Sequence, residues 1–264
     1  MANTFIAVEG QHDQEFICGL LKSLGFSKVV KVAELNDIFG KRLIDTKFPH
    51  GGDLHQRVPN PMFLRRDDDW IAVRAAGGET DKLLPVVRTM LNVLRSYPGS
   101  LNSIGIFRDA DELPAKDSFD NFCKEFESIK EVEGYEINFP ATPGQIGDGN
   151  PRVGFFVVPD NVMPGALEEL LHECGNVVYP NLIEGAQKFV DSVDLEMLNA
   201  KDKRLLLKPH GRKKAVVACA ADILKPGMSI ATSIHQNRWL CEESQNLPRI
   251  TAVTAFLKEL CGIE

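Results

Sequence analysis

The chain lacks three features that would place it in particular classes of protein. Its six cysteines among 264 residues form no C-x-x-C pair, and their spacing favours neither a zinc site nor a disulfide framework. No apolar run approaches the roughly 18 residues that a membrane-spanning helix needs. The opening residues, MANTFIAVEG, show no basic leader and no long apolar stretch of the kind found in signal peptides. These absences predict a cytoplasmic protein that does not contact the membrane.

The sequence also lacks an excess of positive charge, since its formal net charge is −7 at pH 7. An acidic chain repels a phosphate backbone on average, so contact with nucleic acid requires a local basic patch or bridging metal ions. Hydrophobic residues make up 44% and charged residues 25%, which is ordinary usage for a globular protein that buries its own core.

Short apolar runs alternate with helical patterns through the first two thirds of the chain. The runs are predicted strands at residues 4–8, 70–74, 103–107 and 155–158. Helical periodicity follows each run, as in the apolar rows between Leu83 and Leu94. This alternation predicts an α/β fold with a mostly parallel, Rossmann-like sheet flanked by helices.

The alternation divides the chain into two predicted parts. Residues 1–178 form the α/β domain, and a polar tract rich in Pro and Gly at about residues 24–69 is interpreted as an insertion or extended loop. Residues 179–264 read as a helical C-terminal extension that packs on this domain. Its last helix has the clearest pattern, with Val253, Phe256, Leu257 and Leu260 on one face.

Acidic residues follow three of the predicted strands. Glu9 follows the first, Asp109 and Asp111 follow the third, and Asp160 follows the fourth. Ligand sites in open parallel sheets lie outside the carboxyl ends of the strands, so we expect these acids to converge. Clustered carboxylates resist ionising together unless a cation is present, and hard oxygen ligands suit Mg²⁺ or Mn²⁺.

Ordinary structural roles compete with metal binding for three further candidate ligands. Asp13 is equally well explained as a cap of the first helix. Asp160, in Pro-Asp-Asn, is more typical of a turn residue than of a ligand. Glu168 lies in the first turn of a helix, where the helix dipole alone favours an anion. Glu9, Asp109 and Asp111 differ, because acids directly after apolar strands favour a functional site.

Two segments resemble the motifs of the TOPRIM domain. Residues 6–10, Ile-Ala-Val-Glu-Gly, with Asp13 three positions on, resemble its first motif, and residues 104–111, Ile-Gly-Ile-Phe-Arg-Asp-Ala-Asp, resemble its D-x-D motif. The opening Val-Glu-Gly-x-x-Asp is most similar to the OLD-like branch of nucleases. Residues 159–168 resemble a branch of small stand-alone bacterial TOPRIM-like proteins. The match covers roughly the first 175 residues.

The resemblance implies roles for the matching residues. It makes Glu9 a general acid/base or metal ligand, and it makes Asp109 and Asp111 ligands of Mg²⁺. Glu112-Leu113-Pro114 stands where a glycine is usual after the D-x-D, and no catalytic-tyrosine domain or zinc ribbon is visible, so a topoisomerase or primase is not expected. The chain has no G-x-x-x-x-G-K-[S/T], so the ATPase partner of an OLD-type nuclease would be a separate protein.

The most basic stretch of the sequence is residues 201–214, KDKRLLLKPHGRKK. It is a candidate for phosphate contacts, although a solvated helix end explains it more simply. Lys214 opens an apolar helical run and is our candidate for a catalytic lysine that points into the acidic crevice. His12, His210 and His235 are scattered and form no recognisable triad. Gly77-Gly78-Glu79-Thr80 is a weak candidate for a phosphate-binding turn.

Three functions are compatible with these patterns. The leading one is Mg- or Mn-dependent phosphodiester cleavage or phosphoryl transfer on nucleic acid, with Glu9 and Lys214 as catalytic residues. The alternative is a non-catalytic TOPRIM-like binding or regulatory protein, which the net charge and the missing glycine favour. A phosphatase or phosphoreceiver is the third, and Glu9 disfavours it because the nucleophilic aspartate of such enzymes follows the first strand.

Overall fold

The computed structural model describes residues 2–44, 60–77, 83–127 and 137–263. In this part of the chain one seven-stranded sheet has the order β2-β3-β4-β1-β5-β7-β6. The central strands β4, β1, β5 and β7 run parallel, and β2, β3 and β6 join antiparallel at the two edges. The strands are β1 (Asn3–Val8), β2 (Ser27–Lys28), β3 (Met62–Arg66), β4 (Asp69–Ala75), β5 (Ser103–Asp109), β6 (Ile146–Gly147) and β7 (Arg152–Val158).

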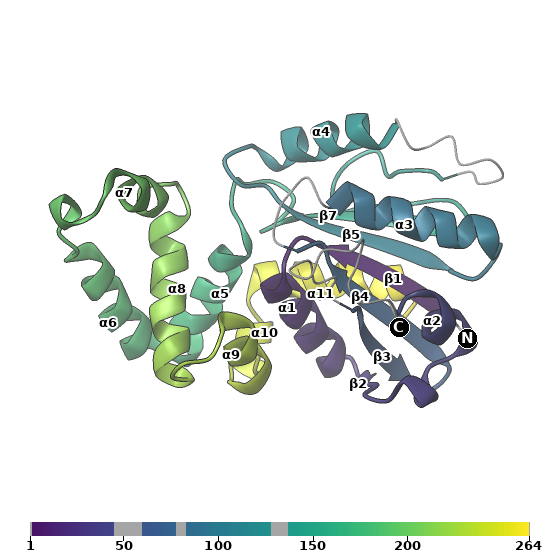
Figure 1. The fold of residues 1–264 in the computed structure, drawn as a ribbon, viewed down its shortest axis with the longest axis horizontal. Coiled ribbons are helices and arrows are strands. Elements are labelled where there is room, and N and C mark those ends of the chain that lie inside the picture. Colours follow the sequence, from purple (N-terminus) through teal and green to yellow (C-terminus); the bar gives the residue numbers. More distant parts are fainter. Residues whose placement is uncertain (1, 45–59, 78–82, 128–136, 264) are drawn as a thin grey trace, which may run out of the picture.

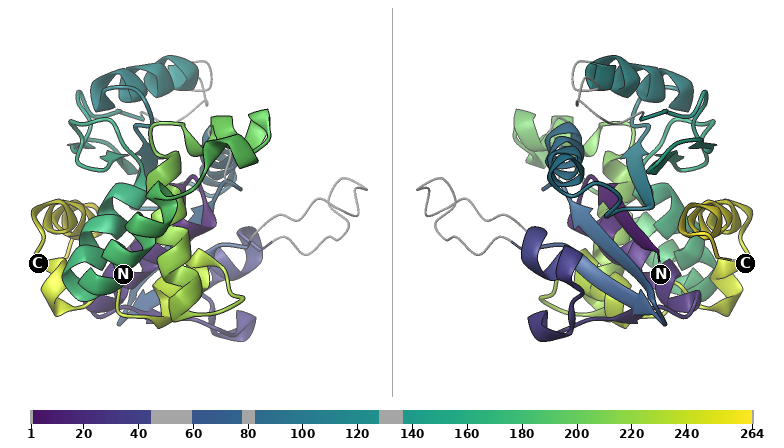
Figure 2. Two further views of the ribbon diagram at one scale, coloured as in Figure 1. Left: turned by 90° about the vertical axis from the view of Figure 1, so that its left-hand side faces the viewer. Right: turned by 90° about the vertical axis from the view of Figure 1, so that its right-hand side faces the viewer.

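Helices cover both faces of this sheet. Helices α1 and α11 pack on one face, and α3 and α4 pack on the other, each over its own apolar core (Figure 2). The predicted α/β class with a mostly parallel sheet is therefore confirmed. The helices are α1 (Gln11–Ser23), α2 (Asp37–Arg42), α3 (Leu83–Ser96), α4 (Ala115–Glu127), α5 (Leu167–Val178), α6 (Pro180–Asp191), α7 (Ala200–Leu206), α8 (Gly211–Leu224), α9 (Ile230–Gln236), α10 (Glu242–Gln245) and α11 (Pro248–Cys261), with 3₁₀ turns at Val32–Glu34 and Leu195–Met197.

The tract from about 24 to 69 is not simply an insertion. It supplies β2 and β3, and β3 pairs antiparallel with β4 through a turn at Asp67, whose φ is 52°. The strand escaped prediction because its apolar part is only Met62-Phe63-Leu64, with Pro61 before it and charged residues after it. β3 lies between β2 and β4, and only Phe63 and Leu64 of its side chains are buried, so its sequence signal is weak. Residues 45–59 of this tract lie outside the described residues.

The helical C-terminal part packs on the domain, and its last helix shares one face of the sheet with α1. Helix α11 lies against β5 and β7, and its apolar face shares one core with α1. Gly105 and Gly154 pair side by side in these strands and let the helix approach closely. A Cβ atom at Gly105 would stand 2.5 Å from Leu260 Cδ2, and one at Gly154 would stand 2.7 Å from Phe256 Cζ.

Helices α5 to α8 lie beyond the carboxyl ends of the parallel strands (Figure 1). The chain begins at the right of that view, β1 runs toward the left, and α6, α7 and α8 stand at the left-hand side. The same helices face the viewer in the left panel of Figure 2. They therefore stand next to the sheet edge at which the predicted acids emerge. None of the helices in the described residues is long and apolar enough to cross a membrane.

The close packing of α11 on the sheet generates a stability prediction. We expect Gly105→Ala to destabilise the protein by about 1–3 kcal/mol, because the added methyl group overpacks the buried contact with Leu260. Gly185→Ala is the matched control, since Gly185 is exposed in α6 and an added Cβ meets nothing within 4 Å. The control should stabilise by about 0.5–1 kcal/mol, because alanine favours a helix interior over glycine. Denaturant unfolding measures both, and equal effects of the two substitutions would contradict this packing.

Candidate functional site

Five of the predicted acids influence one another at the carboxyl edge of the sheet. The electrostatic neighbours of Asp109 are Asp13, Glu9, Glu168 and Asp111. Those of Glu9 include Asp13 and Asp111. The five residues come from the end of β1, the start of α1, the end of β5 and the start of α5. We call this group, Glu9, Asp13, Asp109, Asp111 and Glu168, the acidic site.

Glu9 is the most perturbed member with a defined pKa. It follows β1 directly and is only 9% exposed. Burial, and then repulsion from Asp13 and Asp111, raises its pKa from 4.5 to about 8. The guanidinium of Arg108 opposes this shift, with its Nε atom 3.9 Å from Glu9 Oε1. That separation is too long for a hydrogen bond, so neither Arg108 Nε nor Glu9 Oε1 has a hydrogen-bond partner.

Asp13 closes the first turn of α1 and also lies among the other acids. Its Oδ2 atom accepts a hydrogen bond of 2.8 Å from the backbone N–H of Gly10, which closes the first turn of α1. Burial raises its pKa to about 6, with a further contribution from Glu168. The carboxylate therefore caps the helix and also lies within the field of the other acids.

Asp109 caps a helix that lies far away in the sequence. Its Oδ1 atom accepts a hydrogen bond of 3.1 Å from the backbone N–H of Leu167, the first residue of α5. Burial and the surrounding carboxylates raise its pKa well above the ordinary value. The positive end of the α5 dipole thus points at the most crowded acid of the site.

Asp111 has an uncommon backbone conformation. Its φ is 53°, in the left-handed region that aspartate adopts more readily than most residues. Its N–H and C=O groups form a two-way bridge with Gly165, at 2.8 and 3.0 Å. The bridge joins the loop after β5 to the loop before α5.

Glu168 belongs to the site although the helix dipole alone would explain its position. It is 7% exposed, and its Oε2 atom has no hydrogen-bond partner. The Nζ atom of Lys214 lies 3.7 Å from that oxygen. Burial opposes the charge of Lys214, but attraction to Glu168 and the other acids outweighs burial and raises its pKa. Lys214 therefore stays a cation beside the site and is not suited to act as a general base.

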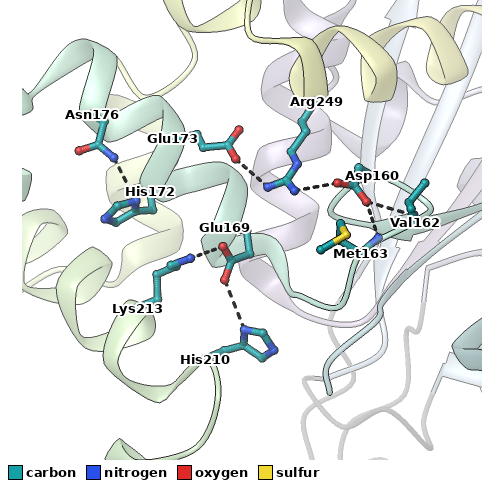
Figure 3. Close-up of polar contacts among 10 residues, drawn as sticks. All are labelled: Asp160, Val162, Met163, Glu169, His172, Glu173, Asn176, His210, Lys213 and Arg249. Carbon is teal, nitrogen blue, oxygen red and sulfur yellow. Dashed lines mark hydrogen bonds and ion pairs between the residues drawn. The ribbon is translucent and has the colours of Figure 1, made fainter. Parts of the chain in front are cut away.

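Asp160 has different partners from the other predicted ligands (Figure 3). Its Oδ1 atom accepts hydrogen bonds from the N–H groups of Val162 and Met163, at 3.0 and 2.8 Å. Its Oδ2 atom lies 2.8 Å from Arg249 of α11, which also binds Glu173 of α5. The turn role that competed with ligation in the sequence accounts for these contacts, so we do not include Asp160 in the acidic site.

A second set of contacts holds α8 against α5. Glu169 pairs with Lys213, and its Oε1 atom lies 3.3 Å from His210 Nδ1 (Figure 3). The other ring nitrogen of His210 lies 2.9 Å from the carbonyl oxygen of Asp111. These contacts fix the start of α8, and with it Lys214, beside the acids. Much of the basic stretch 201–214 is thus used in internal ion pairs, including Lys203 with Glu196 and Arg212 with Asp191.

Sequence reasoning missed several neighbours of the acids. Arg108 is part of the D-x-D segment itself, and its position directly before Asp109 was the available signal. His12 also lies near the site: burial lowers its pKa, while Glu168 acts in the opposite direction. His210 and Glu169 carried no recognisable signal, because their proximity depends on how α5 and α8 pack. The proposed glycine turn at 77–80 lies largely outside the described residues.

The donor set suits a hard divalent cation, although its present arrangement is not that of a complete metal centre. Within the described residues, no group of three or more His, Cys, Asp or Glu side chains is arranged to hold an ion. The site nevertheless offers carboxylate oxygens, and Glu9 Oε1 and Glu168 Oε2 are buried without a hydrogen bond. Buried polar atoms of this kind call for a partner, and cation coordination is one way of supplying it.

Comparison with known proteins defines the family. Residues 3–262 match the family model described as "Protein of unknown function (DUF3226)". The chain belongs to this family. A search of the curated proteins finds no match.

One solved structure, described as the crystal structure of hypothetical protein PH0156 from Pyrococcus horikoshii OT3, is similar over 98% of this chain and 95% of that chain. The TM-score is 0.52 and the sequence identity is 16%, so this likeness shows the fold alone. It supports the α/β architecture over the matched 98% of this DUF3226 chain.

The raised pKa values predict how stability of this DUF3226 protein depends on pH. The folded pKa of Glu9 is about 8, against an ordinary value of 4.5, so between these values the folded state binds a proton that the unfolded state releases. Lowering the pH from 8 to 6 in a chelator should therefore stabilise the protein, by at most about 1.4 kcal/mol per pH unit for each such proton. Unfolding in denaturant across this range measures the slope.

Glu9→Gln provides the control for this pH dependence, because the amide does not titrate. We expect a flatter stability profile in the variant and a higher stability than the wild type at pH 8. A variant profile that is parallel to that of the wild type would show that Glu9 does not carry the effect.

Proposed function

We propose that this protein is a Mg- or Mn-dependent phosphodiester-cleaving or phosphoryl-transfer protein that acts on nucleic acid. The observation that carries the proposal is the acidic site, in which carboxylates from β1, α1, β5 and α5 gather at the carboxyl edge of the sheet. Two buried oxygens in it, Glu9 Oε1 and Glu168 Oε2, lack hydrogen bonds. The order of the two TOPRIM-like motifs along the chain supports the same function.

The members of the acidic site are the residues that would hold the cation. Glu9, Asp109, Asp111 and Glu168 offer oxygen ligands, and Asp13 adds negative charge behind them. A bound Mg²⁺ or Mn²⁺ would polarise phosphoryl oxygens and favour ionisation of a nearby water molecule. Burial, and then repulsion from neighbouring carboxylates, raises the pKa values of Glu9, Asp13 and Asp109. A bound cation would relieve that repulsion, which favours binding.

Two residues of the chain have properties suited to the reaction. The pKa of Glu9 is about 8 without a cation, and a bound cation would lower it toward neutral pH, where Glu9 can accept and return a proton. In hydrolysis the water oxygen bonds to phosphorus, the ester P–O bond breaks, and the proton that Glu9 takes from water passes to the leaving oxygen. Lys214 remains a cation and is placed to bind a non-bridging phosphate oxygen.

The first prediction of this proposal concerns cation binding. Millimolar Mn²⁺ should raise the melting temperature, because binding to the folded state alone adds about 2.7 kcal/mol at a hundredfold excess over Kd. Asp109→Asn should reduce this shift, since it removes a charged oxygen ligand. Asp160→Asn is the matched control: it weakens the contact with Arg249 and lowers the starting melting temperature, but it should keep the Mn²⁺-induced shift. A wild-type melt unchanged by Mn²⁺ would exclude a functional metal site.

The second prediction separates proton transfer from metal binding. Glu9→Gln should abolish Mn²⁺-dependent cleavage of a phosphodiester while keeping much of the Mn²⁺-induced stabilisation, because the amide oxygen still contacts the ion but exchanges no proton. Asp109→Asn should lose both. Cleavage is measured on single- and double-stranded nucleic acid with Mn²⁺. Equal loss of stabilisation in both variants would contradict the separate role of Glu9.

A specific observation favours the alternative of a non-catalytic binding or regulatory protein. Arg108 and Lys214 stand beside Glu9 and Glu168 and neutralise part of the acidic charge without a metal ion. In that case neutralising an acid simply relieves repulsion. Glu9→Gln and Asp109→Asn would then both stabilise the protein, Mn²⁺ would leave the melt unchanged, and the wild type would show no cleavage.

Location and partners form part of the same proposal. All six cysteines are free thiols, as is typical of proteins in a reducing compartment, and this supports the cytoplasm. A separate ATPase would be the protein partner if the chain works as OLD-like nucleases do, since the chain has no phosphate-binding loop of its own.

A further inference from the structure

A pocket of about 890 Å³ opens directly beside the acidic site. It lies between the loop that follows β5 and the segment that contains α7 and the start of α8. Asp111 and Lys214 line it, so one side of the pocket is continuous with the acids. Its volume is in the range that small-molecule sites occupy. We call it the α7 pocket.

Several leucines line the α7 pocket, and two of them are exposed to solvent instead of buried in a core. Leu113, Leu198, Leu205 and Leu206 line it. Leu113 is 42% exposed and Leu205 is 45% exposed, and α7 has no buried residue at all. Leu113 and Leu205 therefore contribute little to a core, whereas the half-buried Leu206 also packs against the main one. Apolar side chains that gather around a cavity beside charged groups are typical of a binding site.

Charged groups in the same pocket narrow the choice of ligand. Lys208 and Lys214 line the pocket and suit a phosphate group, whereas both ring nitrogens of His210 already contact Glu169 and Asp111. Glu112 and Asp202 add carboxylates to the leucine walls. A lipid chain gains nothing from these carboxylates, whereas a nucleobase has both an apolar face and amino groups that donate hydrogen bonds to them.

We propose that the α7 pocket binds the base of an unpaired nucleotide whose phosphate lies at the acidic site. This inference rests on the proposed function for its phosphate end and names the substrate as a nucleotide, either free or at the end of a single strand. A base inside a duplex is stacked and paired, so its face is not available to the leucine walls. Duplex nucleic acid is therefore a poor ligand for this pocket.

A charged residue introduced into the pocket wall tests the proposal. Its matched control is the same substitution two residues further along the chain, outside the pocket. Leu205→Glu puts a carboxylate into the pocket at a position that is already exposed, so folding is not at risk. Leu207→Glu is the control, because Leu207 is 50% exposed on the same segment but is not among the residues that line the pocket. Both changes add the same charge to the same part of the surface.

Binding is measured with the full chain carrying Glu9→Gln, to prevent cleavage, in the presence of Mn²⁺. The probes are a fluorescent single-stranded oligonucleotide, the same strand in a duplex, adenosine monophosphate, and ribose 5-phosphate, which lacks the base. We expect the single strand or adenosine monophosphate to bind at least about tenfold more tightly than ribose 5-phosphate, a difference of about 1.4 kcal/mol. Leu205→Glu should remove that advantage and Leu207→Glu should keep it.

The probes also distinguish the two sources of the nucleotide and the two proposals. Comparable binding of adenosine monophosphate and the single strand identifies the free nucleotide as sufficient, and binding of the strand alone identifies a strand end. If the protein binds the duplex as tightly as the single strand, the pocket assignment is wrong. It is also wrong if Leu205→Glu and Leu207→Glu change nucleotide affinity equally, even where Mn²⁺ stabilises the protein. Base-dependent binding without any Mn²⁺-induced stabilisation keeps the pocket and overturns the metal site.

Discussion

Gathering carboxylates at one edge of a sheet costs electrostatic free energy. The helix N-terminus and the cations around the acids offset part of that cost. The parallel strands β1 and β5 are neighbours, so Glu9 and Asp109 emerge side by side although they are far apart in the sequence. Burial makes the problem harder, because it removes the water that would screen the charges. Burial and repulsion together raise the pKa values of Glu9, Asp13 and Asp109.

Helix α5 is the element that ties the surroundings of the acids together. Its first N–H group binds Asp109, Glu168 enters the acidic site, Glu169 holds α8, and Glu173 binds Arg249 of α11. The first turn of this helix thus contacts the sheet edge and α8, and Glu173 in a later turn contacts α11. The position of Lys214 and the shape of the α7 pocket both depend on these contacts, because they set where α8 begins.

The two proposed functions differ in what neutralises the acids: the neighbouring side-chain cations Arg108 and Lys214, or a divalent metal ion. Arg108 and Lys214 lie 3.9 and 3.7 Å from carboxylate oxygens, distances that give attraction without direct hydrogen bonds. Such loose pairing leaves the oxygens able to take another partner. A divalent ion would compete for those oxygens and leave Lys214 to meet a phosphate, whereas a binding protein would keep the ion pairs as they are.

Most of the layered fold was predictable because its signals are local. Apolar runs ended by acids marked β1, β5 and β7, and helical periodicity marked α1, α3 and α11, since both patterns depend on neighbours within a few residues. The strand β3, between β2 and β4, was missed because its apolar run is very short. The sequence also predicted that the C-terminal part is helical, but it did not predict that this part packs closely on Gly105 and Gly154.

For the site, the sequence by itself determined which acids follow strands, and the parallel order of the strands made their convergence predictable. Only the tertiary structure decided that Glu168 joins them and that Asp160 pairs with Arg249 instead. It also decided that His210 comes to the same edge as the predicted Lys214 and that leucines of α7 line a pocket there. The physical reason is that strand pairing in the sheet fixes where the strand ends lie, whereas contacts between helices depend on packing between segments far apart in the chain.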